Sequence, residues 1–303
     1  MRPTNEFLEV PYDCWHTARS ASQESLIVMP ALDLRRLEEI SQNASRPERG
    51  LMLDGWSIGL SPGLAKRSRC INPFYPGTRP FERNLADARE AFAQAKLPCT
   101  FRITPYISDA GLDDRLDALG YVRFDEALVQ VLPLAELNTQ HLPAVSSAAI
   151  DIRRAPDFAI ASQWVGRLRG DTEEQAAALA ARWQINSGIV TPEFVFLSAD
   201  NPDRVQLHAI DAAAGRCVAR SVTIREGSVV GIFDVGTDPA FRNRGLAGAL
   251  LAHQLRHAQR TGADVAYLQV TPDNPSRRIY ERFGFRTAYR YWYRALPEDA
   301  DPR

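Results

Sequence analysis

The order of the apolar segments predicts an α/β protein of the α+β type, with a mixed, mostly antiparallel central sheet flanked by helices. In the second half, two helical segments precede a run of short strands, and one strand then leads into a long helix. The first half repeats the last part of this order. Each half has a helix that ends in a similar tripeptide, Leu-Gly-Tyr at 119–121 and Phe-Gly-Phe at 283–285. We therefore expect two related tandem domains, 1–140 and 141–303.

Chain length and charge fit this organisation. The chain has 303 residues, of which 45% are hydrophobic, and this is enough for a sizeable core in two domains. Small and polar residues dominate between Leu137 and Ile150, where we place the boundary. A formal net charge of −1 gives no overall attraction to nucleic acid or to anionic membranes. We expect neither as a partner, and the oligomeric state is not indicated.

In the first half, apolar residues at helical spacing predict a helix from Pro80 to Leu97. A shorter helix ends at Gly120, a residue suited to a helix C-terminus. Runs rich in β-branched and aromatic residues predict the strands. These strands cover residues 53–61, 66–74, 99–106 and 121–134, the last as one or two strands, and Ser61-Pro62-Gly63 forms the turn between the first two.

In the second half, two helices are predicted over 155–169 and 172–187, with Asp171 as N-cap of the second. A long helix over 243–261 carries leucines at helical spacing, and a short one follows over 276–283. The predicted strands cover residues 150–154, 194–199, 205–211, 217–225, 229–237, 265–270 and 286–296.

The cysteines and the N-terminus indicate a cellular setting. The four cysteines, Cys14, Cys70, Cys99 and Cys217, are scattered and lack the spacing of a zinc site. We expect a reduced protein with no metal. The N-terminus lacks a basic segment followed by an apolar run, and no stretch approaches the ~18 apolar residues of a membrane span. These observations favour a cytoplasmic protein.

One turn in the second half has the features of an anion-binding site. The strand over 229–237 leads through Asp238-Pro239 into Arg242-Asn243-Arg244-Gly245-Leu246-Ala247, where the long helix begins. The first turn of a helix has unpaired backbone N–H groups and the positive end of the dipole, so it stabilises an anion. Gly245 and Ala247 are small and let phosphate oxygens approach the backbone, while the arginines add positive charge. The glycine spacings of dinucleotide-binding and Walker A loops are absent.

The residues after this turn strengthen the interpretation. They include Leu268-Gln269-Val270, then Asn274, Tyr280 and Gly284-Phe285. Together with the turn, this order resembles the GCN5-related N-acetyltransferase (GNAT) superfamily over roughly residues 150–300. The resemblance implies the GNAT acyl-CoA N-acyltransferase fold. With the repeated first half, it implies a tandem form whose N-terminal GNAT-like domain is degenerate.

The resemblance also implies roles for individual residues. The backbone of Val235, Gly236 and Thr237 runs beside the pantetheine arm, and the Val235 N–H stabilises the oxyanion. Tyr280 protonates the leaving thiolate. The amides that cradle the pyrophosphate are those of Asn243, Arg244, Gly245, Leu246, Ala247 and Gly248, with Arg242 at the rim.

Two assignments stay open. The family Asn usually precedes the Tyr by seven residues, but Asn274 precedes Tyr280 by six and Asp273 holds the seventh position. We favour Asn274, because an amide can both donate to and accept from the pantetheine amides. The general base is Asp234, Glu193 or a group acting through water. His253 and His257 have i, i+4 spacing but no third ligand nearby, which favours a solvated helix face over a metal site.

The first half lacks the phosphate-binding pattern. Its equivalent turn contains Pro76, Pro80 and Phe81, and each proline removes an amide donor. We expect a degenerate domain without cofactor that walls the acceptor cleft. Trp56, Phe74 and Tyr75 are candidates for that wall, although a core position is the more common role for such residues.

The leading hypothesis is an acetyl-CoA-dependent N-acetyltransferase that acetylates a primary amine by direct attack in a ternary complex. No cysteine lies in the motif region, which agrees with the absence of a covalent acyl-enzyme. A non-catalytic acyl-CoA-binding or regulatory module is the alternative, and a nucleotide-phosphate binder is a third possibility. The acceptor, a small-molecule or peptide amine, is not identified by these motifs.

Overall fold

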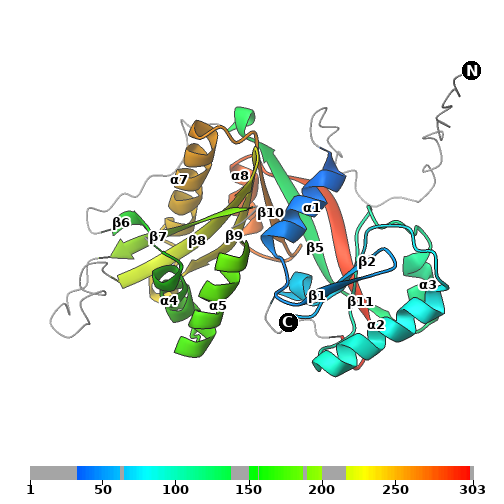
Figure 1. Ribbon diagram of the computed structural model, residues 1–303. Helices are drawn as coiled ribbons and strands as arrows, with labels where there is room; N and C mark the ends of the chain where they lie inside the picture. The colour runs from blue at the N-terminus through cyan, green and yellow to red at the C-terminus, as the bar shows by residue number, and fades with distance from the viewer. Residues whose placement is uncertain are drawn as a thin grey trace, which may run out of the picture.

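The computed structural model describes residues 33–61, 65–137, 150–155, 157–186, 190–199 and 216–300. Their strands form one mixed sheet in the order β1-β2-β3-β4-β11-β5-β10-β9-β8-β7-β6 (Figure 1). Only β3–β4 and β9–β10 pair in parallel among these neighbours. The strands are β1 (Gly50–Leu53), β2 (Trp56–Gly59), β3 (Ile71–Pro73), β4 (Phe101–Ile103), β5 (Val122–Pro133), β6 (Ile150–Arg154), β7 (Thr191–Ala199), β8 (Arg216–Glu226), β9 (Val229–Thr237), β10 (Val265–Val270) and β11 (Arg286–Ala295).

The sheet shows how the two halves are related. The helices are α1 (Leu34–Ala44), α2 (Phe81–Ala95), α3 (Leu112–Ala118), α4 (Phe158–Arg169), α5 (Glu173–Asn186), α7 (Leu246–Arg260) and α8 (Arg277–Arg282). The order β3-α2-β4-α3-β5 of the first half returns as β9-α7-β10-α8-β11 in the second. The predicted repeat is therefore confirmed. Gly120 and Gly284 end the equivalent helices α3 and α8 with positive φ values of 83° and 96°.

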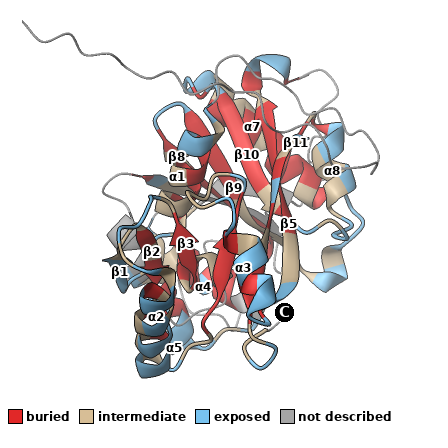
Figure 2. Cartoon of the chain, turned by 90° about the vertical axis from the view of Figure 1, so that its right-hand side faces the viewer, coloured by how far each residue is buried: buried red, intermediate tan, exposed pale blue. Residues whose placement is uncertain are grey.

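The halves exchange their last strands. In the sheet, β11 lies between β4 and β5 of the first half, while β5 lies between β10 and β11 of the second half. Each half thus completes the sheet of the other. The division into 1–140 and 141–303 falls among residues 138–149, outside the described residues, and remains a prediction about sequence boundaries. Figure 2 shows buried residues along the central strands, where the two halves meet.

Helices cover both faces of the sheet in the second half (Figure 1). On one face, Leu251 and Leu255 of α7 pack against Ile232 and Leu268. We call this the α7 face, and α8 lies on it too. On the opposite face, α4 and α5 pack against β8. The same face carries α1 across the strands that join the halves. We call it the α1 face.

Most predicted elements are confirmed, with shifts of a few residues at their ends. The segment 53–61 is wrong as one strand, because Asp54 and Gly55 have positive φ and turn the chain between β1 and β2. The segment 66–74 begins with the short 3-10 helix η1 (Lys66–Ser68) before β3. The remaining 3-10 helices are η2 (Leu134–Glu136) and η3 (Pro239–Phe241). Residues 62–64 of the predicted turn and the predicted strand 205–211 lie outside the described residues.

Two helix assignments also need correction. Sequence reasoning missed α1, although Asp33 caps it by accepting a hydrogen bond from the Arg35 N–H at 2.9 Å. The N-terminus of α5 is capped by Thr172, not by Asp171. The Thr172 hydroxyl accepts from the Gln175 N–H at 3.2 Å, and the Gln175 side chain accepts from the Thr172 N–H at 2.8 Å. These reciprocal bonds form a capping box.

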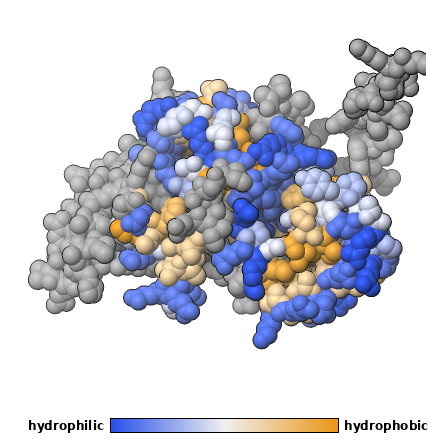
Figure 3. All heavy atoms as spheres, in the orientation of Figure 1, coloured by the Kyte–Doolittle hydropathy of each residue, from blue (hydrophilic) through white to orange (hydrophobic). Residues whose placement is uncertain are grey.

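The outer edge of the first half carries apolar side chains. Leu51 and Met52 of the edge strand β1 are exposed, and Figure 3 shows a hydrophobic area in this part of the surface. Trp56, in contrast, is buried in the core with Phe101, while Tyr75 is exposed. Among the described residues, no helix has the length and apolar composition needed to cross a membrane.

Candidate functional site

The parallel strands β9 and β10 diverge partway along β9. Their pairing runs from Val229 opposite Val265 to Ile232 opposite Leu268 and stops there. Strand β9 continues to Thr237, while β10 stays paired with β5 on its other side up to Val270. The backbone edge of β9 beyond Ile232 therefore has no strand partner on the β10 side, and its polar groups can bind an extended ligand.

A bulge lies immediately after this divergence. Between the pairs Val222–Phe233 and Arg220–Gly236, β9 has one residue more than β8, and Asp234 takes a positive φ of 51°. The Arg220 guanidinium binds the Asp234 carboxylate through two hydrogen bonds, of 2.9 and 3.2 Å. A Cβ at Gly236 would lie 2.9 Å from Arg220 Nη1. The small size of Gly236 thus lets this ion pair lie against the bulged strand.

Val235 and Tyr280 both lie on the α7 face. Both side chains are half-buried and pack against one apolar cluster, and the Tyr280 ring lies 6.2 Å from that of Phe285. Burial raises the pKa of the Tyr280 phenol, so the group keeps its proton through the neutral range. The structure thus places a strand residue and a helix residue, 45 positions apart in the sequence, against the same apolar cluster.

The turn before α7 presents free backbone N–H groups. Asn243 and Gly245 have positive φ values of 61° and 77°, and the helix starts at Leu246. The first amide of the helix with a protein acceptor is that of Ala249, which donates to the Gly245 carbonyl at 3.0 Å. In the described part of the chain, the N–H groups of residues 243–248 have no protein acceptor. The turn therefore has the geometry of an anion site.

Positive charge surrounds this turn. Arg242 and Arg244 are exposed, and the Arg244 guanidinium lies over the Phe241 ring at 4.9 Å. The first turn of α7 contains no acidic residue. Ala247 is half-buried and Gly248 is buried, so neither places a long side chain over the N–H groups. The arginine side chains and the N-terminal end of the helix dipole are thus both positive here.

Asn274 has a local structural role. Its Oδ1 accepts a hydrogen bond from the Ser276 N–H at 2.9 Å, just before α8. This contact uses the carbonyl and leaves the amide hydrogens as donors. Asp273 is exposed beside it. Which of the two contacts pantetheine stays a prediction.

Both candidate general bases have partners. The Asp234 carboxylate is bound to the Arg220 guanidinium, as described above. The Glu193 carboxylate lies 3.5 Å from Nε2 of His257, a residue of α7. The base therefore stays unassigned. Among the described residues, no group of three His, Cys, Asp or Glu side chains is arranged to hold a metal.

The equivalent turn of the first half already holds an anion of its own. The Asp54 carboxylate accepts hydrogen bonds from Asn84 Nδ2 at 2.7 Å, the Thr78 N–H at 2.8 Å and the Arg79 N–H at 2.9 Å. Beginning with that of Asn84, these hydrogen bonds hold the pKa of Asp54 well below its usual range. The side chain occupies the place before α2 that corresponds to the anion site before α7. Sequence reasoning missed this residue.

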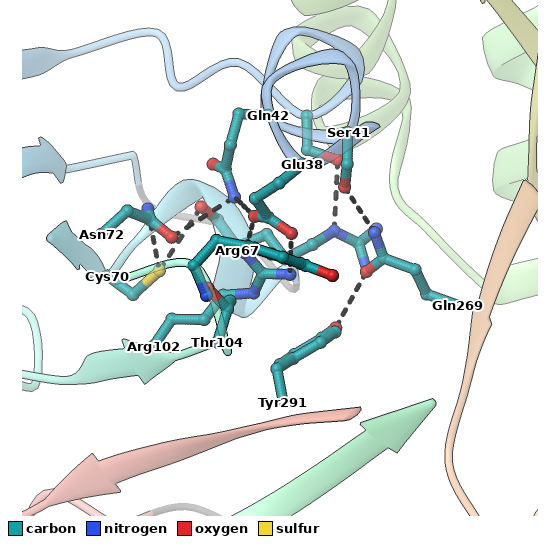
Figure 4. A network of polar contacts seen from close by, with 12 residues as sticks. Glu38, Ser41, Gln42, Arg67, Cys70, Asn72, Arg102, Thr104, Gln269 and Tyr291 are labelled. Carbon is teal, nitrogen blue, oxygen red and sulfur yellow. Dashed lines mark hydrogen bonds and ion pairs between the residues drawn. The ribbon is translucent and has the colours of Figure 1, made fainter. Parts of the chain in front are cut away.

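A buried polar network joins the halves on the α1 face (Figure 4). Glu38 of α1 is ion-paired with Arg102 of β4, and both side chains are almost fully buried, at 1% and 0% exposure. Glu38 also accepts hydrogen bonds from the Tyr289 hydroxyl at 2.6 Å and from Gln42 Nε2 at 3.1 Å. Side chains of α1, β4 and β11 thus meet at the Glu38 carboxylate.

Gln269 of β10 belongs to the same network. Its Oε1 accepts from Arg67 Nη1 at 2.7 Å and from the Tyr291 hydroxyl at 2.8 Å, and its Nε2 donates to Ser41 Oγ at 2.5 Å. The network therefore reaches the point where β9 and β10 diverge. No sequence motif indicated Arg67, because its partners come from distant segments.

Comparison with known proteins agrees with this geometry. Residues 179–285 match the acetyltransferase (GNAT) family. This segment belongs to the GNAT family. The matched segment contains β9, the turn before α7, and Tyr280, so the GNAT match covers the site described above. No curated protein sequence matches the chain.

Solved structures, two of them GNAT proteins, share the fold across both halves. A GCN5-related N-acetyltransferase from Kribbella flavida is 17% identical, with a TM-score of 0.60 over 87% of this chain and 95% of that one. A tandem GNAT protein from the clavulanic acid biosynthesis pathway is 16% identical, with a TM-score of 0.56 over 74% of each chain. A functionally unknown protein from Staphylococcus epidermidis is 12% identical, with a TM-score of 0.55 over 81% of this chain and 92% of that one. These likenesses confirm the predicted GNAT fold class.

Proposed function

We propose that the protein is an acetyl-CoA-dependent N-acetyltransferase that acetylates a primary amine by direct attack in a ternary complex. The observation that carries the proposal is the sequence of features along β9. The strand leaves β10 at Ile232, bulges at Asp234 and ends at the free N–H groups before α7. An extended pantetheine thioester joined to a pyrophosphate fits this combination of an open strand edge and an anion site.

The proposed roles follow from this placement. The amides of residues 243–248 bind the pyrophosphate, and the strand edge at 235–237 binds the pantetheine. The Val235 N–H donates to the carbonyl oxygen as it becomes negative, a contribution of about 10²–10³ in rate for one oxyanion donor. The amine nitrogen forms a bond to the thioester carbon, and the carbon–sulfur bond breaks. Tyr280 supplies the proton that the sulfur takes up, while the amine releases one to a base that is still unassigned.

The cysteines support direct transfer over a covalent acyl-enzyme. Burial raises the pKa of the Cys70 and Cys99 thiols to about 12, so neither is a thiolate nucleophile at neutral pH. Cys217 lies on β8, where its thiol donates to the Ala219 carbonyl at 3.7 Å. Cys14 lies outside the described residues. Burial thus keeps the Cys70 and Cys99 thiols protonated, which makes both poor acceptors of an acetyl group.

We also propose one cofactor site per chain. In the first half, Asp54 supplies the negative charge at the turn before α2, and its carboxylate would repel a phosphate there. This supports a degenerate N-terminal domain over residues 1–140 and a catalytic domain over 141–303. The exchange of β5 and β11 makes each domain part of the other's sheet.

An assay with acetyl-CoA and a panel of primary amines tests the function. We expect acetyl-CoA binding by calorimetry and release of free thiol with at least one amine. Tight binding without thiol release across a broad panel would support the non-catalytic acyl-CoA-binding alternative. Thermal protection by ATP but not by CoA would support a nucleotide-phosphate binder and contradict the proposal.

Gly245→Ala tests the anion site. Gly245 has a φ of 77°, with open space around its Cβ position, so an added methyl meets no neighbour but strains the backbone by about 1–2 kcal/mol. We expect this strain to turn the amides away from the pyrophosphate and to lower acetyl-CoA affinity by roughly 5- to 30-fold. Calorimetry with acetyl-CoA measures the change.

Gly227→Ala is the matched control. Gly227 lies in the turn between β8 and β9, has a φ of 59° and also has open space around its Cβ position. It carries the same kind of backbone strain away from the proposed site. Equal losses of affinity in the two variants would contradict the placement of the pyrophosphate at Gly245.

A further inference from the structure

We propose that Arg67 binds a carboxylate of the acceptor, so the acceptor is a small amine that also carries a carboxylate, such as an amino acid. This inference rests on the proposed acetyltransferase function and names the substrate class of the same site. It depends on the position of Arg67, on the absence of a carboxylate partner for it among the described residues, and on the partial exposure of the residue.

Arg67 reaches from η1 of the first half to the divergence of β9 and β10 in the second. Its Nη1 donates to Oε1 of Gln269 at 2.7 Å, and its Cζ lies 5.7 Å from the centre of the Phe233 ring. Gln269 and Phe233 are the first residues on each strand after the parallel pairing ends. The guanidinium therefore spans the two strands on the α1 face, two residues before Val235.

The Arg67 charge has no carboxylate to neutralise it in the described part of the chain. The hydrogen-bond acceptors of its side chain are neutral groups, namely Gln269 Oε1 and Ser45 Oγ at 3.3 Å. Nearby guanidiniums differ in this respect, because Arg102 is paired with Glu38 and Arg220 with Asp234. Figure 4 shows Arg67 pointing toward Gln269, beside the Glu38–Arg102 pair.

An unpaired guanidinium away from bulk water is unfavourable, and a bound anion offsets that cost. Arg67 is half-buried: the residue keeps some solvent exposure, although its guanidinium is surrounded by other groups of the protein. A guanidinium is charged at every working pH and offers a planar fork of donors that matches a carboxylate. The same charge repels cationic acceptors such as polyamines, which selects against them.

The position of Arg67 also limits the size of the acceptor. The guanidinium lies beside Phe233, while the reacting thioester is proposed to lie at the Val235 N–H, two residues further along the strand. An amine that attacks there while its carboxylate contacts Arg67 must hold the two groups a few bonds apart. This favours a free amino acid over a protein side chain, whose nearest carboxylate is not attached at a defined distance.

The test compares acceptors in matched pairs, each an amino acid and its uncharged carboxamide, with α- and ω-amino acids as separate arms. We expect wild-type kcat/KM to favour the carboxylate in at least one arm. We expect Arg67→Gln to lower kcat/KM for that carboxylate by about 10- to 100-fold and to change the carboxamide much less. Arg67→Lys keeps the charge but not the planar fork, so its kcat/KM for the carboxylate should fall between the values of wild type and Arg67→Gln.

Arg225→Gln is the control variant. Arg225 also donates only to neutral groups, including the carbonyls of Gly227, Thr261 and Gly262, but it lies opposite Val230, where β9 and β10 are still paired. The Arg225→Gln variant removes one positive charge without changing the proposed site, so it should keep the preference for the carboxylate acceptor. Acetyl-CoA affinity and thermal unfolding of each variant show whether the fold is intact.

The outcomes separate this inference from the proposed function. Thiol release at equal rates with carboxylates and carboxamides in wild type would overturn the role of Arg67 alone. Equal losses for both acceptors in Arg67→Gln would overturn it as well. Calorimetric binding of an amino acid that Arg67→Gln abolishes, without any thiol release, would leave the inference standing and remove the acetyltransferase function.

Discussion

Replacement of Glu38 by Ala is expected to lower the free energy of unfolding by about 3–5 kcal/mol, the range for breaking a buried ion pair from one side. The variant leaves the Arg102 guanidinium at 0% exposure without its carboxylate. It also removes the acceptor of the Tyr289 hydroxyl. Urea unfolding followed by circular dichroism measures the change.

Glu39→Ala is the control for this prediction. Glu39 is the next residue of α1 and is paired with Arg36, but both side chains are about half exposed, at 45% and 50%. An exposed pair contributes about 0–1 kcal/mol. A loss for Glu38→Ala no larger than that for Glu39→Ala would contradict the importance of the buried network.

The Glu38–Arg102 pair makes the free energy of unfolding depend on pH. Burial by itself would raise the pKa of Glu38, but the Arg102 charge and the hydrogen bonds from Arg102, Tyr289 and Gln42 outweigh it and lower the pKa below its ordinary value of 4.5. The stability from this lowered pKa is present above the ordinary value and is lost as the pH falls through the lower pKa of the folded protein. Glu38→Gln should therefore weaken the pH dependence of unfolding in that acid range.

Replacement of Tyr280 by Phe is expected to lower turnover by about 100-fold or more, the lower end of the range for general acid catalysis. Loss of the hydroxyl removes the proposed proton donor to the sulfur and keeps the ring that packs against Phe285. Acetyl-CoA affinity should change little. Single-turnover kinetics with acetyl-CoA and a competent amine separates the chemical step from binding.

Tyr121→Phe is the matched control for Tyr280. Tyr121 is buried in the first half, and its hydroxyl has no hydrogen-bond partner among the described residues. Loss of the Tyr121 hydroxyl should leave turnover unchanged.

The raised pKa of Tyr280 keeps its phenol protonated through the neutral range, so we expect titration of this phenol not to limit the rate there. Wild-type turnover in Tyr280→Phe would remove its assigned role.

Local sequence patterns predicted much of the fold because short-range physics controls them. The turn before α7 follows from a strand, a proline and a glycine with positive φ, all within a few residues. The repeat of the two halves was visible because Gly120 and Gly284 end equivalent helices. The hairpin at Asp54-Gly55 was missed, although its dipeptide is a known turn signal, because the apolar run continued across it.

Several parts of the site could not be predicted in this way. The bulge at Asp234 is a mismatch in register between two strands, and no property of β9 alone specifies it. The partners of Asp234 and Glu193 come from other elements, so their availability as bases depends on packing. Asp54 serves as the anion of the first half only because the hairpin brings it to the N-terminus of α2.

The sequence by itself determined the anion-binding turn, the order of helices and strands, and the position of Tyr280 after the turn. These depend on backbone preferences and periodicity within short windows of the chain. Only the tertiary structure decided that β5 and β11 exchange places and that Arg67 reaches β9 and β10. Such contacts join residues far apart in the chain, and their free energy depends on burial and charge that arise only after the elements pack.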